Sequence, residues 1–376
     1  MNISSRASNI IKNGIRSFGS NITYDLTVGQ PDFLVPSCLK EEIKHIVDND
    51  KNGYISTGGE IYIKKLIIEK YRKKYTLFSE ADEKNIVITS GVTGGLYSAL
   101  LALIDIGDTV LLADPYFSPY VDMIKLAGGK VKLIDTYPDF YLTADRIEKQ
   151  IDNHCKVLLI NSPNNPTGRI IPLAELDKIV RLCKEHNITI LSDEIYESYV
   201  YTDKYNSLGD ITNEAVIFRG FSKSHGVTGW RIGFIIAPTE IAGIIERIQG
   251  KIYVSAPSIT HYTIPTAITY DNSGFCRLLA ERRNAVLSIL RDVCPDIFCD
   301  GGFFVFINIE NSCGMTGTEF VSVLRTVGVA ILPGIIFSAR DTHCRLSLTC
   351  NTEKLISASN IIKKCIIACR KKRELK

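Results

Sequence analysis

The chain has 376 residues, of which 45% are hydrophobic and 23% are charged, as is ordinary for a globular protein. That length is enough for two domains with a large buried interior. The formal net charge of +3 gives no reason to expect nucleic acid or an acidic membrane surface as a partner. No apolar run is long enough to cross a bilayer, so we expect no membrane association.

The first 24 residues contain Arg6, Lys12 and Arg16 and no acidic residue. This composition is weakly similar to that of a transit peptide. We interpret the segment instead as an N-terminal arm of the folded protein, packed against the smaller of two domains.

From about residue 85, short apolar runs alternate with amphipathic segments. We expect strands at 85–90, 109–113, 130–134, 156–161, 188–193, 215–220 and 232–237. Helices are expected at 91–104, 120–127, 143–151 and 172–186. This alternation predicts an α/β fold in which a mostly parallel, seven-stranded sheet is flanked by helices on both faces.

The pattern changes after about residue 270. A long helix containing Arg282 and Arg283 is followed by strands at 303–309 and 344–349 and by a last helix from Glu353. These elements predict a second, smaller α+β domain. We expect the large domain at 40–265 and the small domain to combine 1–39 with 266–376.

Eleven cysteines are scattered along the chain without a C-x-x-C pair. A secreted protein would tend to pair them, so we expect free thiols in a reducing cytoplasm. Cys365 and Cys369 lie four residues apart, but no histidine or second cysteine pair accompanies them. We therefore expect no metal site.

Two loops at predicted strand ends contain residues suited to binding an anion. Residues 90–95 (SGVTGG) join a strand to a helix, and their backbone N–H groups can hold a phosphate at the helix N-terminus. Such turns are common, and this one lacks the lysine of a P-loop and the spacing of a dinucleotide fingerprint. Residues 162–168 (SPNNPTG) form either a plain turn or a rigid loop, with prolines that can be cis, that fixes an asparagine amide near an anion.

Two charged residues also end predicted strands. Asp193 ends a buried strand, where a carboxylate is costly unless a positive group meets it. A core ion pair would meet that need, and so would a protonated pyridine nitrogen. Lys223 follows Gly220, and an apolar setting can free its amine to act as a nucleophile, although most lysines are simply exposed. Arg231 follows eight residues later.

Each of these groups is ambiguous alone, but their shared placement is informative. The carboxyl ends of parallel strands lie at one edge of a sheet, so both loops, Asp193, Lys223 and Arg231 are expected to meet there. Pyridoxal 5′-phosphate (PLP) chemistry requires this set: an amine for covalent attachment, a carboxylate for the ring nitrogen and anchors for the phosphate. The residues therefore predict a PLP site.

The sequence resembles the class I and II aminotransferases, of the aspartate-aminotransferase type, which have PLP transferase fold type I. The resemblance extends from Leu26 to the final helix. It rests on VGQPDF at 28–33, GYISTGGE at 53–60, SPNNPTG at 162–168, SDEIY at 192–196, FSK at 221–223, GWRIG at 229–233, and LPG…CRLSLTCN from 332 to 351.

The resemblance assigns the central catalytic roles. Lys223 matches the lysine that binds the cofactor covalently and moves the proton between the substrate Cα and the cofactor. Asp193 matches the acid that keeps the ring nitrogen protonated. Tyr196 and Asn165 match the pair that hydrogen-bonds the phenolic oxygen of the ring.

Other positions match residues that hold the rest of the cofactor. Phe117 falls where an aromatic ring stacks on the cofactor, and Ile195 falls where a side chain packs on the opposite face. Tyr54 matches a tyrosine that reaches the phosphate from the other subunit, which implies a homodimer with shared sites. The remaining phosphate-binding positions are Gly91, Val92, Thr93, Ser222 and Arg231.

The resemblance also assigns substrate contacts and shows departures. Arg345 matches the arginine that grips the α-carboxylate in a bidentate fork, with the Gly29 N–H and Asn165 nearby. Gly220 stands where many members have a phosphate-binding serine, and His261 stands where a glutamine is common. No residue matches the second arginine that recognises a dicarboxylate, so the sequence does not support specificity for aspartate or glutamate.

The implied activity is a ping-pong transamination between an L-amino acid and a 2-oxo acid. Other reactions of the same fold stay open, namely β-elimination by a lyase, or the action of a specialised cyclase or oxidase. A different class is a non-catalytic PLP-binding module, as in regulators fused to a DNA-binding domain. That class is disfavoured because Lys223 and Arg345 are both present and no helix-turn-helix precedes the fold.

Overall fold

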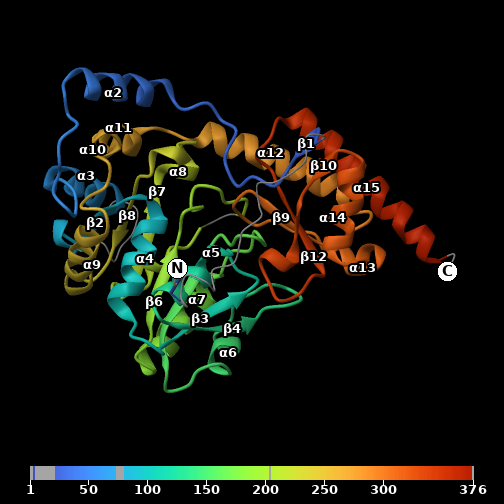
Figure 1. Cartoon of the computed structure of the whole chain (residues 1–376), viewed down its shortest axis with the longest axis horizontal. Helices are drawn as coiled ribbons and strands as arrows, with labels where there is room; N and C mark the ends of the chain where they lie inside the picture. Colours follow the sequence, from blue (N-terminus) through green and yellow to red (C-terminus); the bar gives the residue numbers. More distant parts are fainter. Residues whose placement is uncertain (1–2, 5–21, 73–79, 203–204, 375–376) are drawn as a thin grey trace.

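The computed structural model of the chain (Figure 1) describes residues 3–4, 22–72, 80–202 and 205–374. Most of the expected N-terminal arm therefore lies outside the described residues. None of the helices within these ranges combines the length and the apolar character that crossing a membrane requires.

A seven-stranded sheet is the centre of the larger part of the molecule, in the order β2-β8-β7-β6-β5-β3-β4. Its strands run parallel except where β8 pairs with β2 and β7. The predicted sheet is confirmed, and each expected strand boundary lies within one residue of the observed one. The strands are β2 (Ile86–Thr89), β3 (Thr109–Asp114), β4 (Lys130–Asp135), β5 (Cys155–Asn161), β6 (Thr189–Asp193), β7 (Val216–Gly220) and β8 (Gly233–Ile236).

The strands are continuously apolar because helices cover both faces of the sheet. Val157 and Leu159 of β5 belong to one hydrophobic core, and Leu158 and Ile160 belong to the other. Side chains alternate between the faces along a strand, so each of these positions must be apolar.

The first of these cores is completed by α4 (Gly91–Leu103), α5 (Pro119–Leu126) and α9 (Thr239–Ile252). The second is completed by α2 (Ser37–Asp48), α3 (Ile61–Arg72), α6 (Ala144–Glu148), α7 (Leu173–Glu185) and α11 (Ile264–Thr269). Shorter elements are α8 (Phe221–Ser224), α10 (Ser258–His261) and the 3₁₀ turns η2 (Glu83–Asn85), η3 (Leu208–Asp210), η4 (Thr228–Trp230) and η5 (Gly334–Ile336).

The helices expected at 91–104, 120–127 and 172–186 are confirmed as α4, α5 and α7. The helix expected at 143–151 is shorter. Thr143 starts it, because its hydroxyl accepts from the Arg146 N–H at 3.3 Å. After Glu148 the chain continues as turns toward β5.

The smaller part of the molecule lies beside the large sheet, on the right in Figure 1. Its three-stranded antiparallel sheet has the order β11-β12-β9, and a short parallel pair joins β1 to β10. The predicted α+β region is confirmed. Its elements are β1 (Tyr24–Asp25), α12 (Ser273–Leu290), β9 (Phe304–Asn308), α13 (Ile309–Cys313), α14 (Gly317–Thr326), β10 (Val329–Ala330), β11 (Leu332–Pro333), β12 (His343–Ser347) and α15 (Thr352–Glu374).

The segment after β1 connects the two parts. The Ser347 N–H donates to the Leu26 carbonyl, and the Thr349 hydroxyl donates to the Val28 carbonyl. These bonds hold residues 26–29 along the end of β12. The same residues face the carboxyl ends of β6 and β7, so the segment forms one wall of a cavity between the two sheets.

Candidate active site

A cavity of about 290 Å³ lies at the carboxyl ends of the parallel strands. Twelve of the fourteen residues predicted for the site line it. They are Gly29, Val92, Thr93, Phe117, Asn165, Asp193, Ile195, Tyr196, Ser222, Lys223, Arg231 and Arg345. The strand-end argument and the family resemblance together therefore selected residues that the tertiary structure does bring together.

The other two predicted residues do not line the cavity. Gly91 lies just behind its wall, where a Cβ atom would come within 2.6 Å of the Arg231 guanidinium. Tyr54 is 93% exposed and contributes nothing to the cavity of its own chain.

Lys223 lies in α8, directly after β7, and its amine points across the cavity. Nζ donates to the Gly29 carbonyl oxygen at 2.6 Å. The pKa of this amine falls from 10.5 to about 8, chiefly through burial and also through the positive charges of Arg345 and Arg231, while Asp193 opposes the shift. A lysine with a lowered pKa supplies free amine near neutral pH, which a nucleophile or a general base requires.

Asp193 ends β6 and is 4% exposed. One carboxylate oxygen accepts from the Tyr120 hydroxyl at 2.6 Å and the other from the Ile195 N–H at 3.1 Å. Burial raises its pKa to about 6, against the lowering effects of Tyr120, Ile195 and Lys223. Because no ion pair to Asp193 exists among the described residues, a cationic group in the cavity would find a ready partner.

Arg345 on β12 is the counterpart of Asp193 on the opposite wall. It is 4% exposed, and it donates to the Asn165 side-chain oxygen at 3.0 Å and to the Thr27 carbonyl at 2.6 Å. Its guanidinium lies between the rings of Phe304 and Phe337, at 4.2 and 4.6 Å from their centroids. Its Nε has no hydrogen-bond partner, and no carboxylate pairs with it in the described ranges, so the cavity holds a buried cation suited to an anion.

Asn165 is held in place by the end of β5. The Asn161 side chain accepts from the Asn165 N–H at 2.8 Å and donates to the Asp193 carbonyl at 2.9 Å. Both proline bonds in this loop, after Ser162 and after Asn165, are cis. Tyr196 is buried beside the loop, and burial together with the negative charge of Asp193 raises the pKa of its phenol.

Another wall of the cavity is an anion cradle at the N-terminus of α4. Gly91 has a φ of +68°, and any side chain there would collide with Arg231. Gly233 has a similar constraint, since a Cβ would lie 2.9 Å from the Val92 nitrogen. The start of α4, with Val92 and Thr93, lines the cavity together with Ser222 and Arg231, and this set favours a phosphate.

Sequence reasoning missed Tyr120 and Asn161. Asn161 is the last residue of a predicted strand, so the rule that selected Asp193 could also have selected it. Tyr120 lies in the first turn of α5, and nothing in the sequence indicates that its hydroxyl reaches Asp193.

The structure gives local reasons for both departures from the family pattern. A Cβ at Gly220 would lie 3.1 Å from the Gly233 Cα and from the Ile232 carbonyl oxygen, so a serine would need its neighbours to move. His261 is fully buried, and its Nε2 accepts from the Glu60 N–H at 3.2 Å. Burial lowers the pKa of His261 to about 4, so a neutral ring supports the 53–60 loop.

Comparison with known proteins identifies the family. The family model described as "Aminotransferase class I and II" matches residues 21–362, which is most of the chain. The chain therefore belongs to the class I and II aminotransferases, which are PLP-dependent enzymes that transfer an amino group from an amino acid to a 2-oxo acid by a ping-pong mechanism.

The relatives of this chain are named for several different substrates. The chain is 31% identical to the aspartate aminotransferase of Thermotoga maritima over 365 residues, which cover 95% of this chain and 93% of the relative. It is 32% identical to a probable N-acetyl-LL-diaminopimelate aminotransferase of Bacillus subtilis, over 93% and 92% of the two chains. A crystal structure of an aromatic aminotransferase from Pyrococcus horikoshii superposes with a TM-score of 0.88 at 29% identity, covering 95% of this chain and 98% of that one.

The residues in the cavity fit the cofactor of this family. Asp193 is a buried carboxylate without an ion-pair partner in the described ranges, Lys223 offers a free amine, and the start of α4 faces Arg231 as an anion cradle. These three features match the ring nitrogen, the aldehyde and the phosphate of PLP.

Proposed function

We propose that Lys223 is the catalytic lysine of this aminotransferase, that Asp193 and Tyr196 set the electronics of the cofactor, and that Arg345 binds the substrate α-carboxylate. The observation that carries the proposal is the convergence of Lys223 of α8, Asp193 of β6 and Arg345 of β12 on one cavity. Bound PLP supplies an aldehyde carbon and an electron-withdrawing ring, which together weaken the substrate Cα–H bond.

Lys223 serves first as the covalent anchor and then as a base. Once displaced by an amino acid, the free amine would act as the base that takes the substrate Cα proton and as the acid that gives it back in the 1,3-proton shift of transamination. Its lowered pKa, about 8, makes the unprotonated amine far more abundant near neutral pH than in an ordinary lysine, as this step requires. The Gly29 carbonyl, 2.6 Å away, fixes the amine at the wall where the substrate carboxylate also enters.

Arg345 and Asn165 orient the substrate. Arg345 already donates to Asn165, so an entering carboxylate meets both side chains together, and the unpaired Nε completes a bidentate contact. Asp193 would hold a proton on the ring nitrogen of bound PLP through its charge, and the Tyr120 hydrogen bond fixes the orientation of its carboxylate. Phe117, Ile195, Val92, Thr93, Ser222 and Arg231 hold the ring and phosphate, with Gly91 behind them.

A Lys223→Ala substitution tests this proposal. We expect the variant to lose transamination completely, because both the anchor and the base are removed. Lys251→Ala, which removes an exposed lysine of α9, is the matched control and should keep wild-type turnover. The second readout is the visible absorbance band of the purified protein, which should be absent in the Lys223 variant after dialysis and present in the control. Wild-type turnover by the Lys223 variant would overturn the assignment.

We also propose a homodimer in which Tyr54 reaches the phosphate of the partner subunit. The support is a group of exposed apolar side chains close to Tyr54 along the chain and at the end of α9. They are Val47, Tyr54, Ile61, Tyr62, Leu66, Ile252 and Val254. Exposed apolar residues in such number mark an interaction surface. A Tyr54→Phe substitution should weaken cofactor retention without changing the oligomeric state measured by light scattering.

The division at 39/40 and 265/266 and the cytoplasmic location are further proposals. All strands of the large sheet fall within 40–265, while β1 and β9 to β12 fall outside it. All eleven cysteines are free thiols, as a reducing compartment favours.

A further inference from the structure

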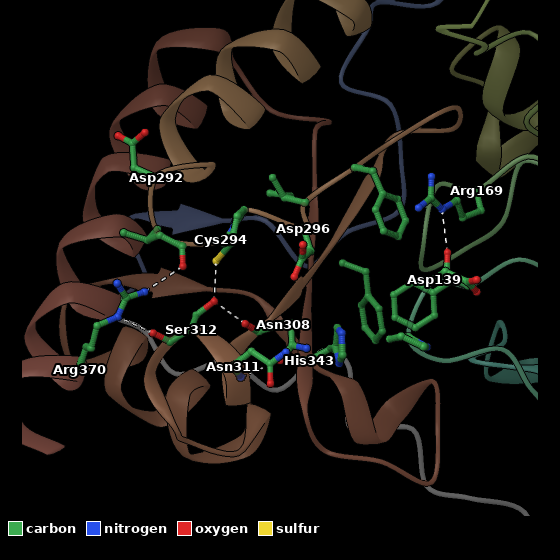
Figure 2. A pocket seen from close by; sticks show the side chains of 17 residues that line it. Asp139, Arg169, Asp292, Cys294, Asp296, Asn308, Asn311, Ser312, His343 and Arg370 are labelled. Atoms are coloured by element: carbon green, nitrogen blue, oxygen red, sulfur yellow. Dashed lines mark hydrogen bonds between the residues drawn. The ribbon is translucent and has the colours of Figure 1, made fainter. Parts of the chain in front are cut away.

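A second cavity, of about 840 Å³, lies apart from the site around Lys223 (Figure 2). Residues 138–140 and Arg169 of the larger part form one side of it. The smaller part forms the other side through residues 292–298, β9, α13, β12 and α15. This interdomain pocket shares no lining residue with the first cavity, and its volume is typical of a small-molecule site.

One wall of the interdomain pocket is aromatic. Phe140 contacts Phe298 and Phe306, with ring centroids 5.8 and 5.7 Å apart. His343 stacks on Phe306, with a centroid distance of 4.8 Å and an interplanar angle of 17°. Arg169 already lies over the Phe298 ring, with its Cζ 3.2 Å from the centroid, so a flat ligand ring would pack on the remaining faces and edges of this wall.

The buried histidine in this wall has an unused nitrogen. His343 is 5% exposed, and burial lowers its pKa to about 4, so the ring is neutral near neutral pH. Its Nδ1 lies 2.7 Å from the Thr342 hydroxyl, whereas its Nε2 has no hydrogen-bond partner within the described ranges. Because the ring lines the pocket, this nitrogen is available to a polar group of a ligand.

Among the charged side chains that line the pocket, one acidic side chain has no hydrogen-bond or ion-pair partner in the described ranges. Four of the five charged side chains in the lining already have partners: Asp139 with Arg146, Arg169 with Asp300, Asp292 with Lys363, and Arg370 with the carbonyl oxygens of Val293 and Ser312. Asp296, the fifth, is exposed and has no hydrogen bond or ion pair to any described side chain. Figure 2 shows it between the Cys294 end and the aromatic end of the pocket.

We propose that the interdomain pocket binds a small aromatic amine, with its ring on the wall of Phe140, Phe298 and Phe306, its protonated amine at Asp296 and a polar group at the His343 Nε2. The pocket contains no lysine, so this ligand binds without covalent attachment. The site is not a second copy of the catalytic one, because Lys223, Asp193 and Arg345 all line the other cavity.

The probe for this site is N,N-dimethyl-2-phenylethylamine. This tertiary amine is protonated at neutral pH and cannot condense with the cofactor aldehyde. Calorimetric titration of the cofactor-loaded protein should give a Kd on the order of 1 mM, as expected for a ligand of this size. The uncharged 2-phenylethanol and the anionic 3-phenylpropionate should bind at least about fivefold more weakly, the contribution of a partly exposed ion pair. Equal or tighter binding of the anion overturns the proposal.

Three variants locate the probe. Asp296→Asn should weaken amine binding about fivefold and leave 2-phenylethanol binding unchanged, since only the charge contact is lost. Phe298→Leu should weaken both probes, because it removes an aromatic face. Asp292→Asn is the matched control, and it should bind the amine normally because this acid already pairs with Lys363.

Transamination should be unaffected in all three variants, since none changes a residue of the catalytic cavity. The titration is repeated with a saturating 2-oxo acid in that cavity. Unchanged amine affinity is expected. Loss of amine binding under that condition would place the probe beside Lys223 and overturn the proposal, as would equal amine affinity in wild type and Asp296→Asn.

Discussion

Asp193 and Glu194 are consecutive buried carboxylates at the end of β6, but the two regions around them differ. Glu194 is 1% exposed, pairs with Arg219 and accepts hydrogen bonds from Ser207 and the Leu208 N–H. Asp193 is 4% exposed and lines the catalytic cavity, with only the Tyr120 hydroxyl and the Ile195 N–H as donors.

The difference shows how one buried carboxylate stabilises the fold while its neighbour stays available to a ligand. The charge of Glu194 is met by a permanent cation of the protein, which also pairs with Glu197 on the same side. Within the described ranges no cation forms an ion pair with Asp193, and burial raises the pKa of its carboxyl to about 6. A ligand with a positive ring nitrogen supplies the missing partner, and no ligand is needed around Glu194.

Of the two carboxylates, Asp193 should matter more for activity, as tested by Asp193→Asn, which keeps the shape of the side chain and removes its charge. We expect kcat/KM to fall by about 10²- to 10⁴-fold, because the amide does not stabilise a protonated ring nitrogen. Steady-state kinetics with a range of amino donors would measure the loss. A decrease smaller than about tenfold would show that Asp193 does not hold the ring.

The same substitution should stabilise the cofactor-free protein in a pH-dependent way. The folded pKa of Asp193, about 6, lies above the unfolded value of 3.8. Its charged form therefore destabilises the fold, and this cost appears as the pH rises from about 4 to about 6. Denaturant unfolding should give similar stability for wild type and Asp193→Asn at pH 4, and up to about 3 kcal/mol more for the variant at pH 7. An equal difference at both pH values would contradict this.

Substitution of Glu194 should have the opposite effect on stability and destabilise the fold. Glu194→Gln leaves Arg219 buried with one carboxylate partner fewer, and we expect the free energy of unfolding to fall by about 3 kcal/mol. Cofactor binding by the remaining folded protein should stay normal, as followed by visible absorbance. If Glu194→Gln lost the cofactor but kept its stability, the comparison between the two carboxylates would be wrong.

A smaller effect is expected from Tyr120→Phe. Loss of the 2.6 Å hydrogen bond removes a group that lowers the pKa of Asp193, so that pKa should rise further. We expect roughly tenfold weaker activity, as for a hydrogen bond to a charged group, and an acidic limb of the pH–rate profile displaced to higher pH. A lower rate with an unchanged pH profile would indicate only a packing role.

The smallest effect is expected at His261, a buried polar group outside the cavity. His261→Gln can keep an acceptor for the Glu60 N–H, so its stability should change by less than about 1 kcal/mol, whereas His261→Leu should lose about 1–3 kcal/mol. The folded pKa of about 4 lies below the usual 6.5, so the stability that the neutral ring contributes is present above pH 6.5 and is lost as the pH falls toward 4. Thermal unfolding at several pH values would measure both changes.

Much of the catalytic cavity could be predicted from the sequence. Asp193, Asn165 and Lys223 end or follow buried strands, and the shared edge of a parallel sheet brings such residues together. Only the family resemblance pointed to Arg345, which lies on β12, and to Gly29 and Phe117, which lie in loops. The role of Tyr54 stays a prediction, because its contact is expected with another subunit.

The sequence by itself determined the seven strands, because continuous apolar runs can only be buried on both faces of a covered sheet. It also determined the chemistry, because an amine, a carboxylate and a phosphate cradle recur at strand ends. Only the tertiary structure decided that Tyr120 meets Asp193, that Gly220 leaves little room for a serine, and that Asp296 and His343 line one pocket. Those relations join segments that are far apart along the chain, and local sequence patterns do not record the distances between them.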